Sequence, residues 1–507
     1  MATTNVIKRK ILRNSFWSLT SSILNRFGSL ALTIILARFL MPEKYGLYII
    51  TLSIAMIFCS FSDLGISSTF VRYISMSIKK DKSKIPVYYR YLLKIKFFLT
   101  LALSLILIII SYPLAIYVFK NNSLFLPFLV AAFYIFALSF ESFYQQVFYL
   151  VEKVYYLNFK EFFNSTLRIV FSIFIFYFIA SSYQVVGIFV SFALVSLFMT
   201  IFSIYYAKKI FPELFVKSIE KIDKKKVIVF AGFMTFISIS SLLLWYIDSI
   251  LLGFFVSPLY AGYYQAAESL VLGVVGILSF PTVIFLPVFS KLSKNHLKKS
   301  FDVAIRYLSL ITIPAIFGFL ALGRFFIKLL YGANYLPSAI PLYFLSPLLL
   351  LISFFNLFSS IFTAKGKLKI YAKLIIITGI IDVVLNLVLI NTFNHFFGPS
   401  SAMIGSALSL IIAWTFFTMG SLYYLKKELD FKISINYILK PLISGIIMFL
   451  ILTYSITFIT KMNWFFGIIE VLVGAAIYFI VLLLLKGLDK RDIDLVKISL
   501  KRDIKPL

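Results

Sequence analysis

The segment that decides the fold is Ile34–Tyr73, which reads IILARFLMPEKYGLYIITLSIAMIFCSFSDLGISSTFVRY. An apolar run ends at Leu40, a short polar link follows around Pro42 and Gly46, and a second apolar run continues to Arg72. Proline has no backbone N–H to donate, and glycine tolerates backbone dihedrals that other residues avoid. The link therefore predicts a tight turn between two membrane-spanning helices.

The same pattern recurs in the second half of the chain. Residues Leu251–Tyr264 align without gaps on Ile35–Tyr48. An internal repeat of this length predicts two lobes, each opening with the same helical hairpin. The identical pairs are Leu36 with Leu252, Phe39 with Phe255, Pro42 with Pro258, Gly46 with Gly262, and Tyr48 with Tyr264.

Composition places the chain in a membrane. Of its 507 residues, 61% are hydrophobic and 14% charged, whereas soluble proteins average about 45–50% apolar and about 25% charged residues. The first apolar segment is longer than the roughly 7–15 residues of a signal-peptide core, so we expect it to be a retained span. The single cysteine, Cys59, excludes an intrachain disulfide, and with only His296 and His395 beside it we predict no metal and no cofactor.

Apolar runs of about 20 residues predict an all-α polytopic membrane protein with about fourteen transmembrane helices. We expect two pseudo-symmetric six-helix bundles followed by two C-terminal helices. The predicted parts are an N-terminal lobe (1–208), a basic cytoplasmic linker (209–226), a C-terminal lobe (227–427), the last two helices (428–485) and a cytoplasmic tail (486–507). The predicted spans are 15–38, 44–71, 90–113, 124–150, 155–180, 183–207, 227–256, 259–289, 303–322, 336–363, 371–392, 401–425, 434–460 and 464–485.

The net charge of +29 is distributed as the topology of a membrane protein requires, and does not indicate nucleic-acid binding. With the N-terminus placed inside, 39 of the 49 lysines and arginines fall in or beside the inner connections. The positive-inside rule then predicts a cytoplasmic-membrane protein with both termini in the cytoplasm, its lysines in contact with lipid headgroups. The outer connections hold only Arg38, Lys44, Lys120, Arg324, Lys328 and Lys461, and four arginines, Arg26, Arg72, Arg168 and Arg306, lie within spans.

Polar side chains recur at helical spacing in the first and seventh spans. Steps of three or four residues place side chains on one face of a helix, and the repeat superimposes the two stripes. We predict a hydrophilic cavity between the lobes; ordinary helix packing by small polar residues is the alternative. The stripes are Ser18, Ser22, Asn25, Ser29 and Thr33, and Thr235, Ser238, Ser241, Trp245 and Ser249.

Arg26 and Arg168 lie near mid-depth of their predicted spans and are the candidates for binding an anionic group. A charge in the bilayer centre costs at least roughly 2.5–3.5 kcal/mol, so it tends to face a cavity or a partner. Guanidinium grips phosphate through two parallel hydrogen bonds. A structural ion pair between Arg168 and Glu141 is the alternative for that arginine. The candidate substrate-binding residues are Arg26, Asn25, Ser22, Ser29, Arg168, Ser238, Ser241 and Trp245.

Five of the acidic residues within the spans form two groups. Asp248, Glu268 and Asp382 lie in the outer halves of their predicted helices and are candidates for coupling to H⁺ or Na⁺, with a structural role left open. Asp63 and Glu141 lie in inner halves, and with Arg72 they are predicted as gate or structural residues.

The first hairpin resembles a known family. The wording L-A-R-F-L-x-P-x-x-Y-G-x-Y from Leu36, then F-x-D-L-G-I from Phe61 and V-R-Y from Val71, is similar to the start of Wzx/RfbX-type oligosaccharide flippases of the MOP exporter superfamily. The resemblance implies two six-helix bundles forming a V around a central, often cationic cavity. It also implies transport of polyprenyl-(pyro)phosphate-linked oligosaccharide between leaflets, and by helix position it points to Arg26 as a cavity arginine.

The function predicted from these features is a non-enzymatic flippase that works by alternating access, for cell-surface polysaccharide or glycan biosynthesis. Its partners would be the lipid-linked oligosaccharide, membrane lipids, H⁺ or Na⁺, and a polysaccharide polymerase or transferase. The alternative is a cation-coupled drug or metabolite antiporter of the same superfamily. A glycan polymerase or ligase is disfavoured because the outer loops are short and no P-loop, HExxH or nucleophile motif is present. An accessory scaffold protein is also disfavoured, because a scaffold has no need for charged residues within the membrane.

Overall fold

The computed structural model describes residues 2–151, 153–278, 294–429, 435–457 and 464–487. Within these ranges, the side chains of residues 2–26, 236–243 and a few other positions fall outside the description. The described part consists of helices and contains no strand. In it, ten helices, or eleven if one bent pair is counted as a single span, are long and apolar enough to cross a membrane. The prediction of an all-α polytopic fold is confirmed.

The first helix, α1 (Ala2–Asp63), turns back on itself where the sequence predicts a turn. Met41 has non-helical dihedrals (φ 61°, ψ 165°) immediately before Pro42, so two helices meet at this kink. The predicted end of the second helix at residue 71 is wrong. The helix stops at Asp63, and Leu64 and Gly65 take positive φ values of 38° and 67°.

A new helix, α2 (Ile66–Lys80), starts after this break. A Cβ on Gly65 would lie 2.5 Å from the carbonyl oxygen of Ala231 in α7 (Lys224–Phe255). The break between α1 and α2 therefore lies where the backbone at Gly65 closely approaches the backbone of α7, a segment far away in the sequence. Hydropathy does not register such an approach, because both segments remain apolar.

The remaining helices follow the predicted spans with two corrections, except that residues 279–289 of the predicted span 259–289 lie outside the described residues. Predicted span 303–322 is the longer helix α10 (Lys294–Tyr331), and predicted span 336–363 is two helices bent by 51°. The bend lies at Ser346 and Pro347, where proline removes a helical hydrogen bond. The other helices are α3 (Ile85–Pro113), α4 (Phe125–Leu150), α5 (Val154–Phe178), α6 (Gln184–Ile210), α8 (Pro258–Leu278), α11 (Ala339–Leu345), α12 (Leu348–Ala364), α13 (Leu368–Phe397), α14 (Pro399–Leu429), α15 (Asn436–Ile456) and α16 (Trp464–Leu484).

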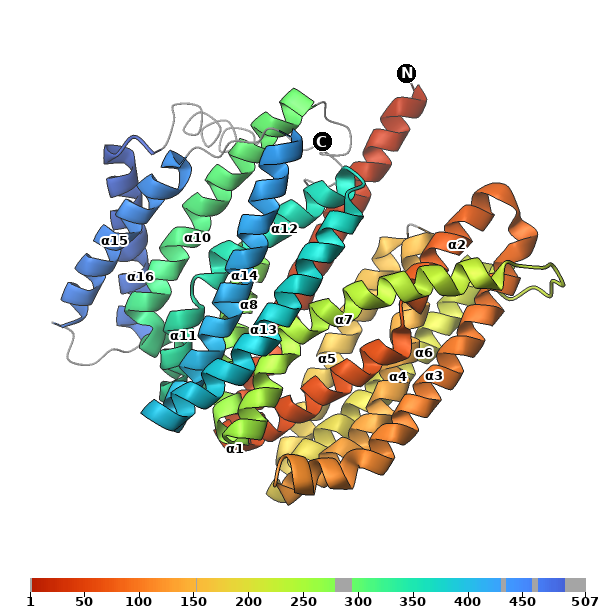
Figure 1. The fold of residues 1–507 in the computed structure, drawn as a ribbon, viewed down its shortest axis with the longest axis horizontal. Coiled ribbons are helices and arrows are strands. Elements are labelled where there is room, and N and C mark those ends of the chain that lie inside the picture. The colour runs from red at the N-terminus through yellow and green to blue at the C-terminus, as the bar shows by residue number, and fades with distance from the viewer. Residues whose placement is uncertain (1, 152, 279–293, 430–434, 458–463, 488–507) are drawn as a thin grey trace.

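Two groups of helices form the body of the molecule (Figure 1). α4 packs against α3 and α6 in the first group, and α13 packs against α14 and α7 in the second. α1 contacts both groups, through α5 on one side and α8 on the other. α15 packs on α10, and α16 on α15, at the far edge of the second group.

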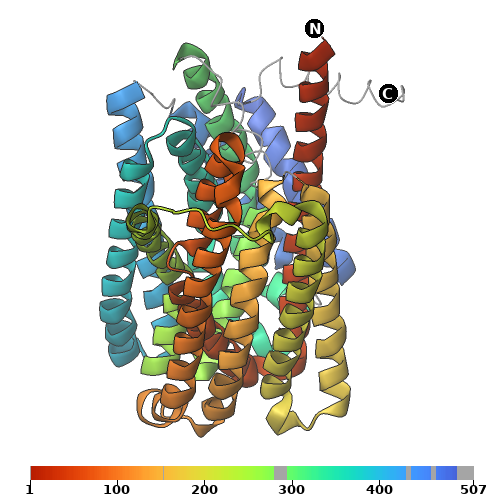
Figure 2. The ribbon, with the colours of Figure 1, turned by 90° about the vertical axis from the view of Figure 1, so that its right-hand side faces the viewer.

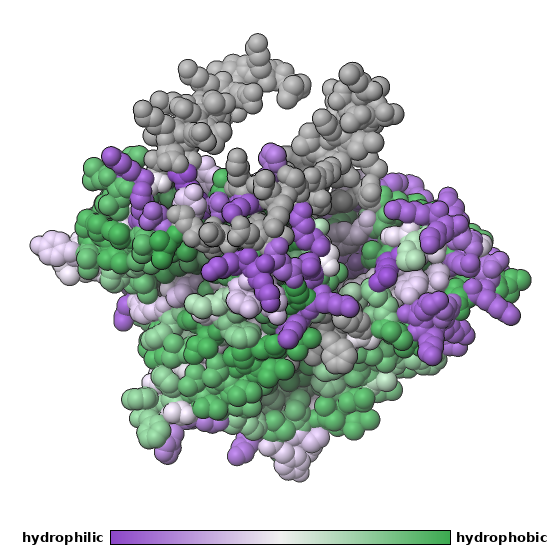
Figure 3. Space-filling model, turned by 45° about the horizontal axis from the view of Figure 1, so that its top comes forward, coloured by the Kyte–Doolittle hydropathy of each residue, from purple (hydrophilic) through white to green (hydrophobic). Residues whose placement is uncertain are grey.

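The helices run along a common direction, which gives the molecule two distinct ends (Figure 2). We call the end where α1 begins the inner end, because the charge distribution predicts it to be cytoplasmic. The opposite end, which carries the kink at Met41, is the outer end. Hydrophilic side chains gather around the inner end, and the flanks are largely hydrophobic (Figure 3).

The two repeated hairpins touch each other at the outer end. A Cβ on Gly46 would lie 1.7 Å from the carbonyl oxygen of Pro258, and a Cβ on Gly262 would lie 2.2 Å from that of Pro42. Each glycine thus admits the backbone of the other repeat, in a nearly symmetric contact. The repeat read from the sequence is therefore a physical interface between the halves.

Polar contacts add to this interface. Arg38 Nε donates to the carbonyl of Leu330 at 2.5 Å. The Tyr335 hydroxyl donates to the carbonyl of Ala37 at 2.8 Å. Both bonds tie α1 to the end of α10 and the turn after it, so the halves are held together at the outer end by backbone contact and hydrogen bonds.

Candidate functional site

A buried network of ion pairs lies between α4 and α5 in the first half. Lys160 Nζ is 2.7 Å from Glu141 Oε1 and 3.3 Å from Glu161 Oε1, and both Lys160 and Glu141 are almost fully buried. Gln145 Oε1 accepts from the same ammonium group at 2.9 Å. The burial of these charges is offset by mutual pairing and hydrogen bonding, as buried ion pairs require.

Arg168 joins this network from α5. Its Nη2 lies 4.0 Å from Glu141 Oε2 and 3.2 Å from Ser196 Oγ, and its guanidinium carbon is 4.9 Å from the centre of the Phe192 ring. The side chain is 16% exposed. The structure thus contains the ion pair with Glu141 that was the alternative to substrate binding.

A second ion pair in the same half joins α1 to α3. Lys96 Nζ lies 2.7 Å from Asp63 Oδ1, and the lysine side chain is 0% exposed. Ser67 Oγ donates to the same oxygen at 2.6 Å. Asp63, predicted as a gate or structural residue, is therefore paired at the break between α1 and α2.

The sequence analysis did not predict that Lys96 and Lys160 are buried, because the charge count assigned both lysines to the inner connections. A signal is present: each lies five or more positions inside its predicted span of 90–113 or 155–180. A lysine at that depth, with an acid on another helix, indicates pairing.

The second half contains buried acids without such partners. Asp248 in α7, Glu268 in α8 and Asp382 in α13 are 1%, 1% and 0% exposed. In the part of the chain that the structure describes, no lysine or arginine forms an ion pair with any of them. These are the three residues predicted as candidates for ion coupling, and the fold brings their helices into one bundle.

Amide and hydroxyl groups connect two of these acids. The Ser406 hydroxyl lies 2.8 Å from Asp248 Oδ1 and 2.9 Å from Asn386 Oδ1. Asn386 Nδ2 donates to Asp382 Oδ1 at 3.1 Å. We call Asp248, Asp382, Asn386 and Ser406 the acid relay.

The acid relay and Glu268 leave acceptor atoms free. Asp248 Oδ2, Asp382 Oδ2 and both carboxylate oxygens of Glu268 are buried without a hydrogen-bond partner. Among the described residues, no three histidine, cysteine or carboxylate side chains are grouped to hold a metal ion. Free buried carboxylate oxygens can be satisfied by a proton, or by one small cation shared with neutral oxygen ligands.

A basic cavity of about 830 Å³ opens at the inner end, between α2, α7 and the start of α13. The guanidinium carbon of Arg72 lies 4.1 Å from the centre of the Phe230 ring, which orients this side chain at the cavity wall. Lys226 pairs with Asp223 at 3.0 Å and, together with the backbone N–H at the start of α7, lowers the pKa of that carboxyl group. The charged residues of this basic pocket are Arg72, Asp223, Lys225, Lys226 and Lys369.

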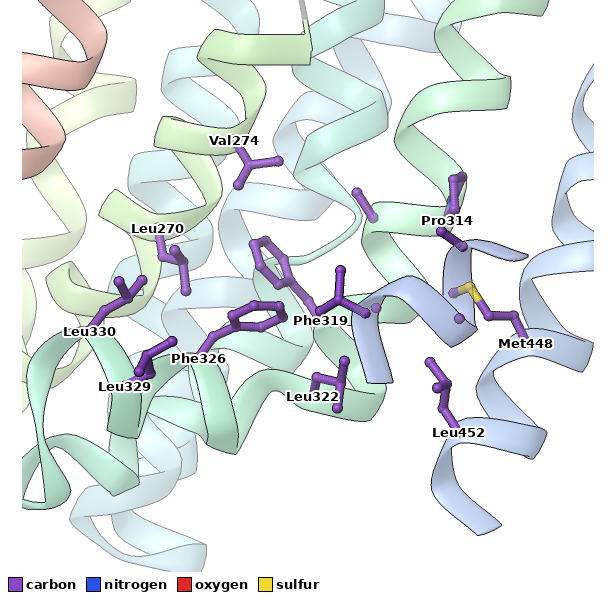
Figure 4. Close-up of a pocket in the computed structure, with 15 residues that line it drawn as sticks. Leu270, Val274, Pro314, Phe319, Leu322, Phe326, Leu329, Leu330, Met448 and Leu452 are labelled. Atoms are coloured by element: carbon purple, nitrogen blue, oxygen red, sulfur yellow. The ribbon is translucent and has the colours of Figure 1, made fainter. Parts of the chain in front are cut away.

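An apolar cavity of about 470 Å³ lies between α8, α10, α15 and α16. Figure 4 shows side chains from these helices pointing into one space, among them Phe319, Phe326 and Met448. The backbone at Gly318 borders it, and a Cβ there would meet no atom within 4 Å. The described residues that line this apolar groove offer hydrocarbon contacts and no charged group.

Several residues predicted to bind substrate cannot be placed. The side chains of Arg26, Asn25, Ser22, Ser238 and Ser241 lie outside the described residues. Of the remaining residues in the two stripes, Ser29 is exposed. Trp245 packs against Trp414, with ring centres 6.0 Å apart, inside the second half.

Solved structures with the same architecture are membrane transporters. The lipid II flippase MurJ, in an inward closed conformation, superposes with a TM-score of 0.69 at 18% identity, over 93% of this chain and 98% of that one. The Vibrio cholerae MATE transporter VcmN, in its bent form, gives a TM-score of 0.55 at 15% identity, over 85% and 100%. A MOP superfamily transporter from Pyrococcus furiosus gives 0.52 at 15% identity, over 84% and 97%. At these identities the likeness establishes the fold.

Sequence comparison identifies the family. No curated protein matches the chain. The family model described as polysaccharide biosynthesis protein matches residues 11–293, more than half of the 507 residues. The chain therefore belongs to the polysaccharide biosynthesis protein family and is a multi-pass membrane protein with the fold of these transporters.

Proposed function

We propose that this protein is a flippase that moves polyprenyl-(pyro)phosphate-linked oligosaccharide across the cytoplasmic membrane for cell-surface polysaccharide or glycan biosynthesis. The observation that carries the proposal is the coexistence of the basic pocket and the apolar groove in one chain. The substrate is an amphiphile with a phosphate group, a polar glycan and a hydrocarbon tail. Each cavity has the chemistry that one end of this molecule needs.

The basic pocket would receive the phosphate group. Arg72, Lys225 and Lys369 bring positive charge to one opening at the inner end, and Asp223 is the single acid among the described residues that line it. Arginine and lysine bind phosphate through charge-assisted hydrogen bonds. Arg26, with Asn25, Ser22, Ser29, Ser238 and Ser241, is proposed to line the polar path that follows, and Arg168 to border it.

The apolar groove would hold part of the prenyl tail. Its walls are aliphatic and aromatic, and burial of hydrocarbon on such walls stabilises a complex by dispersion contacts even where lipid is the alternative solvent. The structural relative MurJ is a lipid II flippase, and its substrate is therefore also a lipid. That supports the proposal, together with the family.

In alternating access, the two lobes would tilt about the contact between the two hairpins. The proposed lobes are residues 1–208 and 227–427, with 209–226 as linker, 428–485 as the last two helices and 486–507 as a tail. Because Gly46 and Gly262 bring backbone against backbone, the contact has few side chains to repack when the lobes tilt. Both termini are proposed to be cytoplasmic, and a polymerase or transferase would supply or consume the glycan.

Coupling to H⁺ or Na⁺ is proposed to run through the acid relay and Glu268. Their free carboxylate oxygens are the observation that favours a cation. The same observation supports the second candidate function, a cation-coupled drug or metabolite antiporter, as does the likeness to MATE transporters. The two functions differ in the charge of the substrate. The basic pocket favours an anionic substrate, and therefore the flippase.

Leaflet accessibility of a labelled polyprenyl-pyrophosphate oligosaccharide in proteoliposomes tests the proposal. We expect the wild type to expose the label faster than protein-free vesicles do. Gly318→Phe, which fills the apolar groove, and Arg72→Gln should both slow exposure, whereas Gly318→Ala should not. Arg26→Ala tests the proposed polar path in the same assay. Transport of a cationic drug in place of the glycolipid would contradict the proposal and support the antiporter.

A further inference from the structure

A third cavity lies on the flank of the first half, away from both parts of the proposed transport path. It has a volume of about 560 Å³ and is formed by α3, α4 and α6. These helices lie on the side of the molecule that faces the viewer in Figure 2. α4 packs against both α3 and α6, so it forms the floor of the groove and they form its walls. We call this cavity the flank groove.

The flank groove is apolar along most of its length. The rings of Phe97, Phe136 and Phe140 contact one another, with centres 5.1 to 6.3 Å apart. Ala137 provides a small residue on the floor, and Leu197 closes the opposite wall. Phe97 and Leu197 are 41% and 43% exposed. In a membrane, these exposed groups face hydrocarbon, so a lipid chain can lie between the two walls.

Positive charge is confined to the inner end of this groove. Arg90 and Lys94 are exposed and stand one helical turn apart on α3, on the same stripe as Phe97. From Arg90 to Phe97 the helix rises by about 10 Å, so the charges sit above the aromatic rings. Lys94 forms no ion pair with the residues that the structure describes, and Arg90 donates one N–H to the carbonyl of Val216.

We infer that the flank groove is a binding site for an anionic membrane phospholipid. Its headgroup phosphate would contact Arg90 and Lys94, and one acyl chain would lie along the aromatic floor. The charge of the two basic residues is complementary to an anionic headgroup at the level of the membrane surface. A lipid held there bridges α3 and α6 and so stabilises the first half. This inference does not depend on the transported substrate.

Lipid binding by the purified full-length protein tests this inference. Native mass spectrometry in detergent would compare retention of phosphatidylglycerol and phosphatidylcholine with identical acyl chains. Each basic residue near a membrane surface contributes roughly a fivefold preference for anionic lipid. We therefore expect selective retention of phosphatidylglycerol, reduced roughly fivefold by Arg90→Gln or Lys94→Gln and further by the double variant.

Matched variants separate the groove from general surface charge. Lys426→Gln with Lys427→Gln removes two exposed basic residues from the last turn of α14 and should leave selectivity unchanged. Leu197→Trp narrows the groove without altering charge and should reduce retention of both lipids. Equal retention of both lipids by the wild type, or an equal loss in the α14 control, would overturn the inference. So would stronger retention of polyprenyl phosphate than of phosphatidylglycerol, because it would assign the groove to the substrate.

Discussion

In the first half of the molecule, acids of the bundle lie against buried lysines, whereas in the second half three buried acids have no cation partner among the described residues. Glu141 contacts Lys160 at 2.7 Å, and Asp63 contacts Lys96 at the same distance. Asp248 and Asp382 instead meet a serine and an asparagine. The two halves share a repeated hairpin, so they differ in how their acids are paired although they have a common architecture.

The difference suggests a division of labour. A paired buried charge is costly to disturb, because removing one partner strands the other in a medium of low polarity. A buried acid with neutral neighbours has free oxygens for a proton or small cation. We propose that the first half acts as a rigid scaffold and that the second half responds to the coupling ion.

The largest effect is expected from Lys160→Met. The substitution leaves Glu141 and Glu161 close together and without their ammonium partner, with Glu141 3% exposed. Breaking a buried pair costs about 3–5 kcal/mol, so we expect a markedly lower Tm in detergent. Adding Glu141→Gln should restore part of the loss. A single variant with the Tm of the wild type would contradict the scaffold role of the first half.

A matched pair of substitutions compares the halves directly. Asp63→Asn strands the fully buried Lys96 and should destabilise the protein by about 1–3 kcal/mol. Asp248→Asn keeps the shape of the side chain and removes a charge that has no cation partner among the described residues, so it should leave Tm equal or higher. Thermal unfolding of the two variants in one detergent checks this. Equal destabilisation by both would mean that the halves do not differ.

Cation dependence of stability should follow the acid relay. An ion that binds only the folded state raises its stability by mass action, by about 2.7 kcal/mol at 100 times Kd. We expect Tm of the wild type to rise with Na⁺ at constant ionic strength, or with falling pH if the ion is H⁺. Asp248→Asn should abolish the increment. Ser406→Ala, which removes the hydroxyl between Asp248 and Asn386, should reduce it.

The smallest effect is expected from Asp223, a paired acid outside the membrane. Its pKa is lowered by the Lys226 side chain and by backbone N–H groups. A carboxyl group with a depressed pKa stabilises the folded state above its usual pKa, and this contribution is lost as pH falls through the lowered value. Asp223→Asn should therefore be slightly less stable at neutral pH and should become indistinguishable from the wild type once the pH has fallen below the lowered pKa. A difference that persists at low pH would rule out titration of this carboxyl as its cause.

Local patterns in the sequence predicted most of the helices. Runs of apolar residues predicted the spans, Pro42 predicted the kink at Met41, and the repeat predicted that the hairpins are equivalent. The positions of Asp248, Glu268 and Asp382 within spans were also read from the sequence. These features depend on residues close in the chain, which is why sequence periodicity registers them.

Features that depend on packing between distant helices were not predictable in the same way. The break at Gly65 depends on the approach of Ala231, which belongs to α7 and is far away in the sequence. The roles of Lys96 and Lys160 depend on acids carried by other helices. The basic pocket draws its cations from α2, α7 and α13. The positive-inside rule counts charges on each side of the membrane, so it explains all of these lysines by membrane orientation and does not predict their contacts.

The most direct test of the account is the initial rate of leaflet exposure of the labelled glycolipid under an imposed cation gradient. We predict that wild-type proteoliposomes expose the label faster than empty vesicles, and faster with an inward- or outward-directed gradient of H⁺ or Na⁺ than without it. Asp248→Asn should insert and fold normally but show no response to the gradient. A wild-type rate equal to that of empty vesicles would contradict the flippase, and an unchanged gradient response in Asp248→Asn would contradict the role of the acid relay.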